Sequence, residues 1–242
     1  MKLKVLGSSS KGNCYLLQSV GETLVIEAGL KFQDVQKGLN FNMSSVTGLL
    51  VSHAHKDHSK YAEVFTKHGI DVYMSEQTRD KIELKGHRVH TLSAGEEQKI
   101  GNFTVLPFLT EHDCDGSMGF VVNHPDLGNL LFATDTYYLR YKFQNLNHIM
   151  IEANYALDIL QKNIDSGALA ELVAKRTVKS HFELENLKEW LVSNGLSTVR
   201  NIVLIHLSDG NSDAKRFKKE VEELTFKTVF IADPGLEIFL NP

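Results

Sequence analysis

The sequence predicts an α+β fold in which two packed β-sheets carry helices on their outer surfaces. Apolar or alternating runs typical of strands dominate both halves of the chain, and each half finishes with segments of helical periodicity. Two sheets packed face to face, with helices outside, bury all of these elements together. No repeat, low-complexity tract or Pro/Gly-rich linker interrupts residues 1–242, so we expect a single domain.

The individual elements follow from these runs, and two helix ends have supporting residues. Gly195 follows the fourth helical segment as a stop, and Ser212-Asp213 fits the start of the fifth. Strands are predicted at Leu3–Leu6, Cys14–Gln18, Thr23–Glu27, Gly48–Ser52, Asp71–Met74, Phe103–Leu109, Gly119–Asn123, Asn129–Ala133, His148–Glu152, Asn201–His206, Thr228–Ala232 and Leu236–Leu240. Helices are predicted around Lys60–His68, Gln77–Leu84, Leu157–Val178, Leu184–Asn194 and Ser212–Leu224.

One short segment concentrates metal-binding side chains directly after an apolar run. The segment is His53-Ala-His55-Lys-Asp57-His58, and it follows Gly48–Val51. Histidine occupies only 11 of the 242 positions, so three imidazoles and a carboxylate within six residues are unlike a chance polar loop. A strand that ends in such a loop can point several ligands at one spot. The segment therefore predicts a metal site, with enough ligands to help hold two ions.

Three further strands deliver a candidate ligand at or just past their carboxyl ends. Each such residue alone carries little weight, but several strand ends together indicate a common centre, because rigid sheets hold the loops in which sites are built. These residues are His112 after Leu106–Thr110, Asp135 after Leu130–Thr134, and His206 after Ile202–Ile205.

The order of these residues resembles that in the metallo-β-lactamase superfamily of binuclear hydrolases, over nearly the whole chain. The resemblance implies a four-layer αββα sandwich and two divalent metal ions in each chain. Imidazole-rich sites suit Zn²⁺, while the two carboxylates leave Mn²⁺ open. The resemblance implies one ion held by His53, His55 and His112, a second held by Asp57, His58 and His206, and Asp135 as the bridge between them.

A closer resemblance is to the YycJ-like (WalJ) branch of that superfamily. That branch includes phosphodiesterases and DNA exonucleases, and it lies near the compact phage anti-Pycsar enzymes, which hydrolyse cyclic nucleotides. One departure is Glu27, where the family often has an aspartate expected to orient metal ligands without binding the metal. The similar segments are Val5–Asn13, Ile151–Tyr155, Ser180–Asn186 and His206–Asn211.

The resemblance implies catalytic roles for His181 and Asp57. His181 follows a helical segment and begins a short loop. It is either a helix-capping or surface histidine, or a proton donor to the leaving oxygen or a ligand of a phosphate oxygen. Ser10, Asn13 and Asn154 are candidates for substrate contact.

The loop Ser8–Asn13 permits two interpretations. Its backbone N–H groups could cradle a phosphate, or it could form a tight turn between two strands. It lacks the spacing of a P-loop.

Other polar residues are expected to be structural. Cys14 and Cys114 are interpreted as small buried residues, and the basic run Lys215–Lys219 as the solvated face of a helix, because three glutamates follow it. Surface or turn positions are expected for His68, His87, His90, His124 and His148.

Charge and composition narrow the function. The net charge of −4 and the absence of a basic arm favour a small anionic substrate over long nucleic acid. We therefore expect a binuclear phosphodiesterase acting on a small nucleotide, with a cyclic mononucleotide as the favoured substrate and a DNA or RNA exonuclease as the alternative.

Two other classes stay open: a metal-binding sensor or structural protein without catalysis, and a lactamase or thioesterase, since the same centre can attack a carbonyl. No apolar run is long enough to span a membrane, and no signal peptide precedes the first strand, so we expect a cytoplasmic protein. A homodimer is expected from the resemblance alone.

Overall fold

The computed structural model describes all 242 residues as two seven-stranded mixed sheets with helices around them. The first sheet has the order β14 (Glu237–Phe239), β1 (Lys2–Gly7), β2 (Cys14–Gln18), β3 (Thr23–Ile26), β4 (Val46–Leu50), β5 (Val72–Ser75) and β6 (Val89–Leu92). The second has the order β13 (Thr228–Ile231), β12 (Asn201–Ile205), β11 (His148–Glu152), β10 (Gly128–Ala133), β9 (Met118–His124), β8 (Phe103–Leu109) and β7 (Gln98–Ile100).

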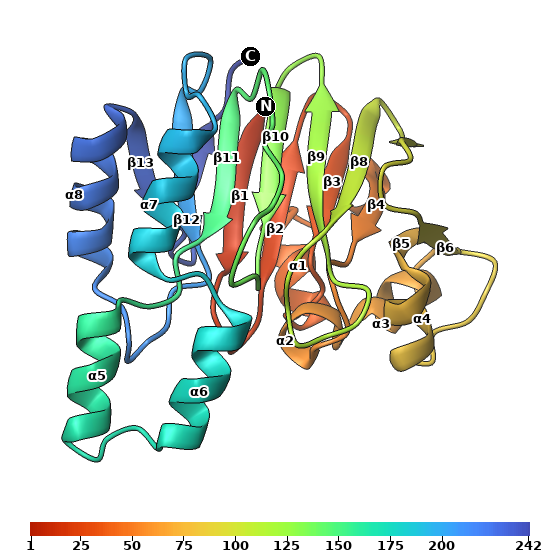
Figure 1. The fold of residues 1–242 in the computed structure, drawn as a ribbon. Coiled ribbons are helices and arrows are strands. Elements are labelled where there is room, and N and C mark those ends of the chain that lie inside the picture. Colours follow the sequence, from red (N-terminus) through yellow and green to blue (C-terminus); the bar gives the residue numbers. More distant parts are fainter.

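The helices lie on the outer faces and at one edge of this pair of sheets (Figure 1). On the side of the first sheet are α1 (Phe32–Gly38), the 3-10 turn Met43–Ser45, α2 (Lys56–Ser59), α3 (Ala62–Lys67) and α4 (Glu76–Lys81). On the side of the second sheet are α5 (Leu157–Asp165), α6 (Glu171–Ser180), α7 (Leu184–Ser193) and α8 (Ala214–Thr225).

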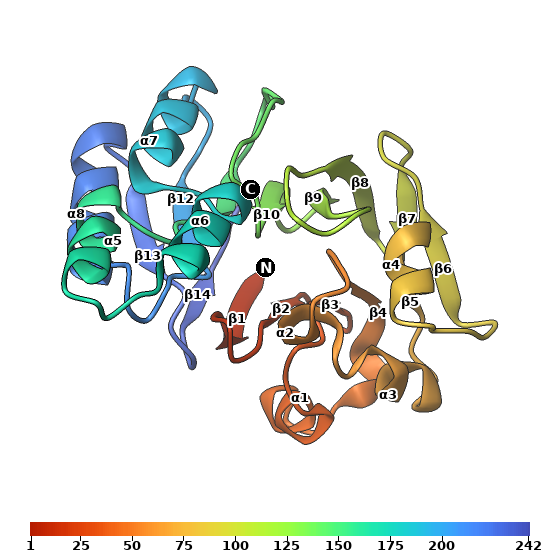
Figure 2. The ribbon, with the colours of Figure 1, turned by 60° about the horizontal axis from the view of Figure 1, so that its bottom comes forward.

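Three hydrophobic layers hold these elements together, and Figure 2 shows the two sheets with the helices on their outer sides. Between the sheets, alternate strand residues such as Phe120 and Phe132 are fully buried. A second layer joins the second sheet to α7 and α8 through Phe182 and Phe217, and a third joins the first sheet to α1 and α3. The predicted α+β sandwich, with helices outside two sheets, is confirmed.

Strand direction decides where the functional loops lie. Strands β10, β11 and β12 are parallel, and β8 reaches the same direction through two antiparallel steps across β9. Their carboxyl ends therefore share one edge of the second sheet. The helices α5 and α6 extend beyond that edge, whereas both termini lie at the opposite one (Figure 1).

The helix predicted over Leu157–Val178 is in fact two helices. α5 ends at Asp165, and α6 begins at Glu171. Gly167 lies between them with a φ of +73°, a left-handed conformation that glycine adopts at low cost and that ends a right-handed helix. The short elements α1, α2, β6 and β7 were not anticipated from the sequence.

Two histidines expected at the surface are buried, so that prediction is wrong for them. His124 is 4% exposed and its Nε2 lies 3.0 Å from Glu22 Oε1, while His148 is fully buried. His148 Nε2 donates to the carbonyl oxygen of Asn241 at 2.9 Å, and its Nδ1 accepts from Asn201 Nδ2 at 3.2 Å. Both ring nitrogens are satisfied only in the neutral form.

This arrangement predicts a pH-dependent stability. Burial lowers the pKa of His148 to about 4; the hydrogen bond to Asn241 opposes the shift, and Arg200 and the N-terminal ammonium add to it. The unfolded chain, with a histidine pKa near 6.5, binds the proton first as pH falls, so stability present above pH ~6.5 is lost towards pH ~4. Between pH 7.5 and 5 the wild type should lose about 2 kcal/mol more unfolding free energy than His148→Gln.

Urea denaturation at several pH values measures this difference. The exposed His87 supplies the matched control, since His87→Gln should keep the wild-type pH dependence. Equal pH dependence in the wild type and His148→Gln would contradict the assignment.

Candidate metal centre

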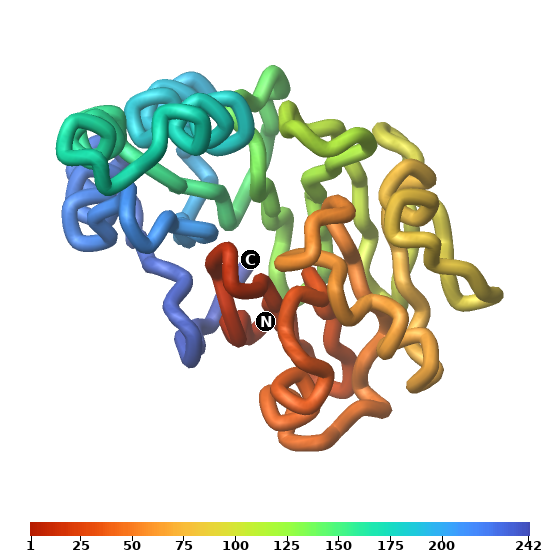
Figure 3. The backbone as a smooth tube through the Cα atoms, turned by 90° about the horizontal axis from the view of Figure 1, so that it is seen from below, coloured from red at the N-terminus to blue at the C-terminus, as the bar shows by residue number.

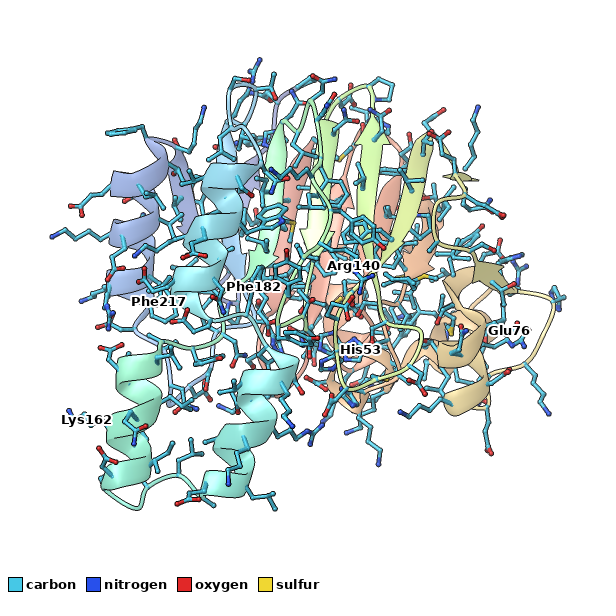
Figure 4. All side chains as sticks on the ribbon, in the orientation of Figure 1. His53, Glu76, Arg140, Lys162, Phe182 and Phe217 are labelled. Carbon is cyan, nitrogen blue, oxygen red and sulfur yellow. The ribbon has the colours of Figure 1, made fainter.

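The predicted ligands come together at the edge where the parallel strands end. Figure 4 labels His53 at the lower ends of the strands. Seen from below in Figure 3, loops from both sheets meet near the middle, with α5 and α6 on one side and α1 to α3 on the other. Residues separated by up to 153 positions in the chain, from His53 to His206, therefore line a single site.

Three of the imidazoles form a first group. His53 Nε2 lies 3.1 Å from His55 Nδ1, and His112 Nε2 lies 3.1 Å from the same atom. Nitrogen ligands 2.0–2.1 Å from a tetrahedral Zn²⁺ ion are separated by about 3.3 Å. The three atoms thus have the spacing of ligands around one small cation.

The tautomer of His112 supports that interpretation. Its Nδ1 lies 2.9 Å from the carbonyl oxygen of Ser180, which can only accept, so Nδ1 carries the hydrogen and Nε2 presents a lone pair. The Nδ1 of His53 lies 2.9 Å from the Ser52 hydroxyl, which can accept its hydrogen. Histidines that bind metals usually donate their other ring N–H to such partners. Burial lowers the pKa values of His53, His55 and His112, which favours the neutral form that binds metal.

A second group lies beside the first. Asp57 Oδ2 is 3.3 Å from His58 Nε2 and 3.4 Å from His206 Nε2. Burial alone would lower the pKa of His206, but Asp135 and the hydrogen bonds to Asp57 and Glu152 raise it to about 10. The surrounding carboxylates therefore favour a positive charge at the second group. A divalent ion can supply that charge when it displaces the histidine protons.

Asp135 stands between the two groups. Its Oδ1 is 3.4 Å from His58 Nε2, whereas its Oδ2 is 3.7 Å from the Nε2 atoms of both His53 and His112. The Asp135 carboxylate thus faces the second group with Oδ1 and the first group with Oδ2. Its backbone has a φ of +46°, which is rare for residues other than glycine and is found where surrounding structure enforces a functional geometry.

Glu27 lies behind His58, where the family resemblance implied an orienting carboxylate. It is fully buried, and its Oε2 faces His58 Nδ1 at 3.4 Å while its Oε1 accepts from the Ser52 N–H at 3.3 Å. His58 Nδ1 has no hydrogen bond of ordinary geometry. The donor set, with an imidazole oriented by a carboxylate from behind, fits a metal ion on the Nε2 side.

The sequence analysis missed Glu152, a fully buried carboxylate at the end of β11. Its Oε1 accepts from His206 Nδ1 at 2.9 Å and from His181 Nδ1 at 2.7 Å. Burial alone would lower the pKa of His181, but Glu152 raises it above its ordinary value. The signal available in the sequence was a carboxylate that directly follows the apolar run Ile149–Ile151.

A cavity of about 460 Å³ opens over both groups. Ser10 and Asn154 line it, as does His181, whose side chain is 21% exposed. Asn154 also donates to the carbonyl oxygen of His206 at 2.9 Å. Further lining residues not anticipated from the sequence are Lys56, Val173, Arg176, Thr177, Leu207, Ser208 and Asn211.

Asn13 does not line this cavity, in contrast to its expected contact with substrate. It is fully buried, and its Nδ2 donates to the carbonyl oxygens of Ser9 at 3.1 Å and Asp57 at 3.3 Å. Asn13 therefore holds the segment that carries Asp57.

The loop Ser8–Asn13 forms a tight turn between β1 and β2. The N–H of Lys11 donates to Ser9 Oγ, that of Gly12 to the Ser9 carbonyl oxygen, and that of Asn13 to the Asp57 carbonyl oxygen. These three donors are satisfied within the protein, which agrees with the turn, whereas phosphate contact by Ser10, which lines the cavity, stays a prediction.

Gly29 permits the close approach of the loop that carries Asp57. A Cβ atom there would lie 1.8 Å from the Asp57 carbonyl oxygen and 2.6 Å from the Asn13 nitrogen. We expect Gly29→Ala to displace Asp57 and His58 and to reduce the divalent metal bound per chain, at a cost of about 1–3 kcal/mol in stability. Elemental analysis after equilibration with Zn²⁺ or Mn²⁺ measures the first effect.

Gly210→Ala is the control, because nothing lies within 4 Å of a Cβ at Gly210 and its φ is ordinary. It should leave the metal content unchanged. Full metal content in folded Gly29→Ala would show that the loop position does not control binding.

Comparisons with known proteins agree with this geometry. The β-lactamase superfamily domain matches residues 24–207. The exodeoxyribonuclease WalJ of Streptococcus pneumoniae is 25% identical over 228 residues, covering 87% of this chain and 83% of that protein. The exodeoxyribonuclease YycJ of Bacillus anthracis is 25% identical over 253 aligned residues, covering 98% and 94%.

A solved structure shares the fold. The metallo-β-lactamase fold protein YhfI from Bacillus subtilis matches with a TM-score of 0.74 at 14% identity, over 98% of each chain. No helix of the present structure combines the length and apolar character needed to cross a membrane. The chain thus belongs to the metallo-β-lactamase superfamily of metal-dependent hydrolases, and to its YycJ/WalJ-like branch.

Proposed function

We propose that this protein is a binuclear metal-dependent phosphodiesterase that hydrolyses a small nucleotide phosphodiester, with cyclic mononucleotides as the leading substrate class. The observation that carries the proposal is the position of Asp135, which faces one ligand group with each carboxylate oxygen below a cavity of about 460 Å³. Two metal ions are the usual way in which hydrolases clamp a phosphoryl group.

The ligands divide between two ions in this proposal. Bound ions of this kind supply Lewis acidity towards a phosphoryl oxygen and lower the pKa of water. The abundance of imidazole favours Zn²⁺, and the carboxylates also permit Mn²⁺. One ion would be held by His53, His55 and His112, the other by Asp57, His58 and His206, with Asp135 shared.

His181 is proposed as the proton donor to the leaving oxygen. Its Nδ1–H donates to Glu152, so the ring is fixed with the opposite nitrogen available at the cavity. Burial alone would lower the pKa of His181, but the Glu152 carboxylate raises it, which favours the imidazolium form that a proton donor requires.

The charge around the cavity supports a small substrate. Lys56 and Arg176 are the two basic side chains that line it. The basic run of α8 is neutralised by pairs such as Arg216–Glu220 at 2.7 Å, as expected for a solvated helix face. A cavity of about 460 Å³ accommodates one nucleotide.

An exodeoxyribonuclease is the second candidate. The names of the relatives in Streptococcus pneumoniae and Bacillus anthracis favour it, at 25% identity. Both candidates use the same phosphoester chemistry and differ in whether a polymer end or a mononucleotide enters the cavity. Parallel assays with cyclic mononucleotides and end-labelled DNA, in the same Zn²⁺ or Mn²⁺ buffer, separate them.

His55→Ala should reduce hydrolysis of either substrate class by at least about 100-fold, because it removes one of the three imidazole ligands of the first group. Circular dichroism should show an unchanged fold, and bound metal should fall. His90→Ala is the control, since His90 lies outside the site. Undiminished activity of metal-free or His55→Ala protein would refute a metal-dependent mechanism.

A leaving-group series tests His181. His181→Gln should slow hydrolysis of a nucleotide diester with an alkoxide leaving group by about 100-fold, because that oxygen requires a proton. A p-nitrophenyl ester, whose leaving group is stable without a proton, should slow by less than about threefold. Equal loss on both substrates, or loss of metal, would contradict the proton-donor role.

A further inference from the structure

One wall of the cavity is formed by a single face of α6. Val173, Arg176 and Thr177 line the cavity, and their spacing of three and four residues places them on the same side of the helix. Arg176 is the only charged residue of that face. Lys175, its neighbour in sequence, instead pairs with Glu171 at 3.6 Å on a different face.

The guanidinium of Arg176 is oriented by one bond. Its Nε donates to Asp113 Oδ2 at 2.8 Å, and no other carboxylate lies within ion-pair distance of the side chain. Neither of its terminal amino groups donates to the protein. Four N–H donors thus remain free on a side chain that is 67% exposed and lines the cavity.

Asp113 connects this cation to the first ligand group. While its Oδ2 accepts from Arg176, its Oδ1 lies 3.3 Å from His112 Nε2. The Asp113 carboxylate is therefore the single link between the Arg176 guanidinium and the candidate ligand His112. An exposed ion pair of this kind contributes little to stability, so fold stability does not account for its placement over the site.

We propose that Arg176 binds phosphate oxygens of the substrate and of the product, and that Asp113 positions it for that contact. The planar fork of a guanidinium matches two oxygens of a phosphate, and holding it through Nε leaves the two amino groups directed at the ligand. This inference deepens the proposed function and rests on it for the identity of the substrate, but not for the binding of a nucleotide phosphate.

Calorimetric binding of adenosine 5′-monophosphate to the metal-free protein tests the contact without turnover. Arg176→Gln should raise the dissociation constant about tenfold or more, the usual effect of losing a hydrogen bond between charged groups. The uncharged nucleoside adenosine should bind both proteins equally. Lys175→Gln, on the other face of α6, should stay within twofold of the wild type.

Asp113→Asn tests positioning. It should weaken binding of the monophosphate, and the double variant with Arg176→Gln should be no weaker than Arg176→Gln alone, because both changes remove the same contact. In steady-state kinetics Arg176→Gln should raise KM for the phosphodiester, with a smaller change in kcat.

An unchanged dissociation constant in folded Arg176→Gln would overturn the inference, and additive effects in the double variant would overturn the positioning role. If the wild type hydrolyses no phosphodiester while Arg176→Gln still loses affinity for the monophosphate, the proposed function fails and the phosphate contact stands.

Discussion

The buried carboxylate of Glu152 is the constraint on which the geometry of the centre depends. A charge removed from water is costly unless donors surround it, and Glu152 is fully buried. Its Oε2 accepts from the backbone N–H groups of Thr136 at 3.0 Å and Phe182 at 3.1 Å, and its Oε1 from His181 and His206. These four donors come from the loops after β10 and β12 and from the α6–α7 connection.

Satisfying that carboxylate brings the functional loops to fixed positions. Thr136 follows Asp135 directly, so the bond to its N–H places the shared carboxylate between the two ligand groups. His206 Nδ1 donates to the same Glu152 carboxylate, which orients the ring so that Nε2 faces Asp57. Both Asp135 and His206 adopt positive φ values, 46° and 53°, a strain that the surrounding hydrogen bonds stabilise.

The cavity over this centre is where substrate choice is made. The ligand groups alone suit any substrate that a binuclear centre can polarise, and the fold leaves that choice open. The wall formed by α6 differs from the ligand groups, because it presents an oriented cation, Arg176, beside apolar and hydroxyl side chains. In the proposed function, recognition of the phosphate and catalysis at the phosphorus atom would therefore belong to different elements of the chain.

The fold class, most strand positions and the candidate ligands could all be predicted from the sequence. The segment His53–His58 could be identified because its ligands are close together in the sequence, and His112, Asp135 and His206 because each lies within three residues of the end of an apolar strand. Only the tertiary structure revealed the roles of Glu152 and of the Asp113–Arg176 pair, and the burial of His124 and His148. Those properties depend on which distant residues meet after the sheets have packed, and local periodicity does not encode such contacts.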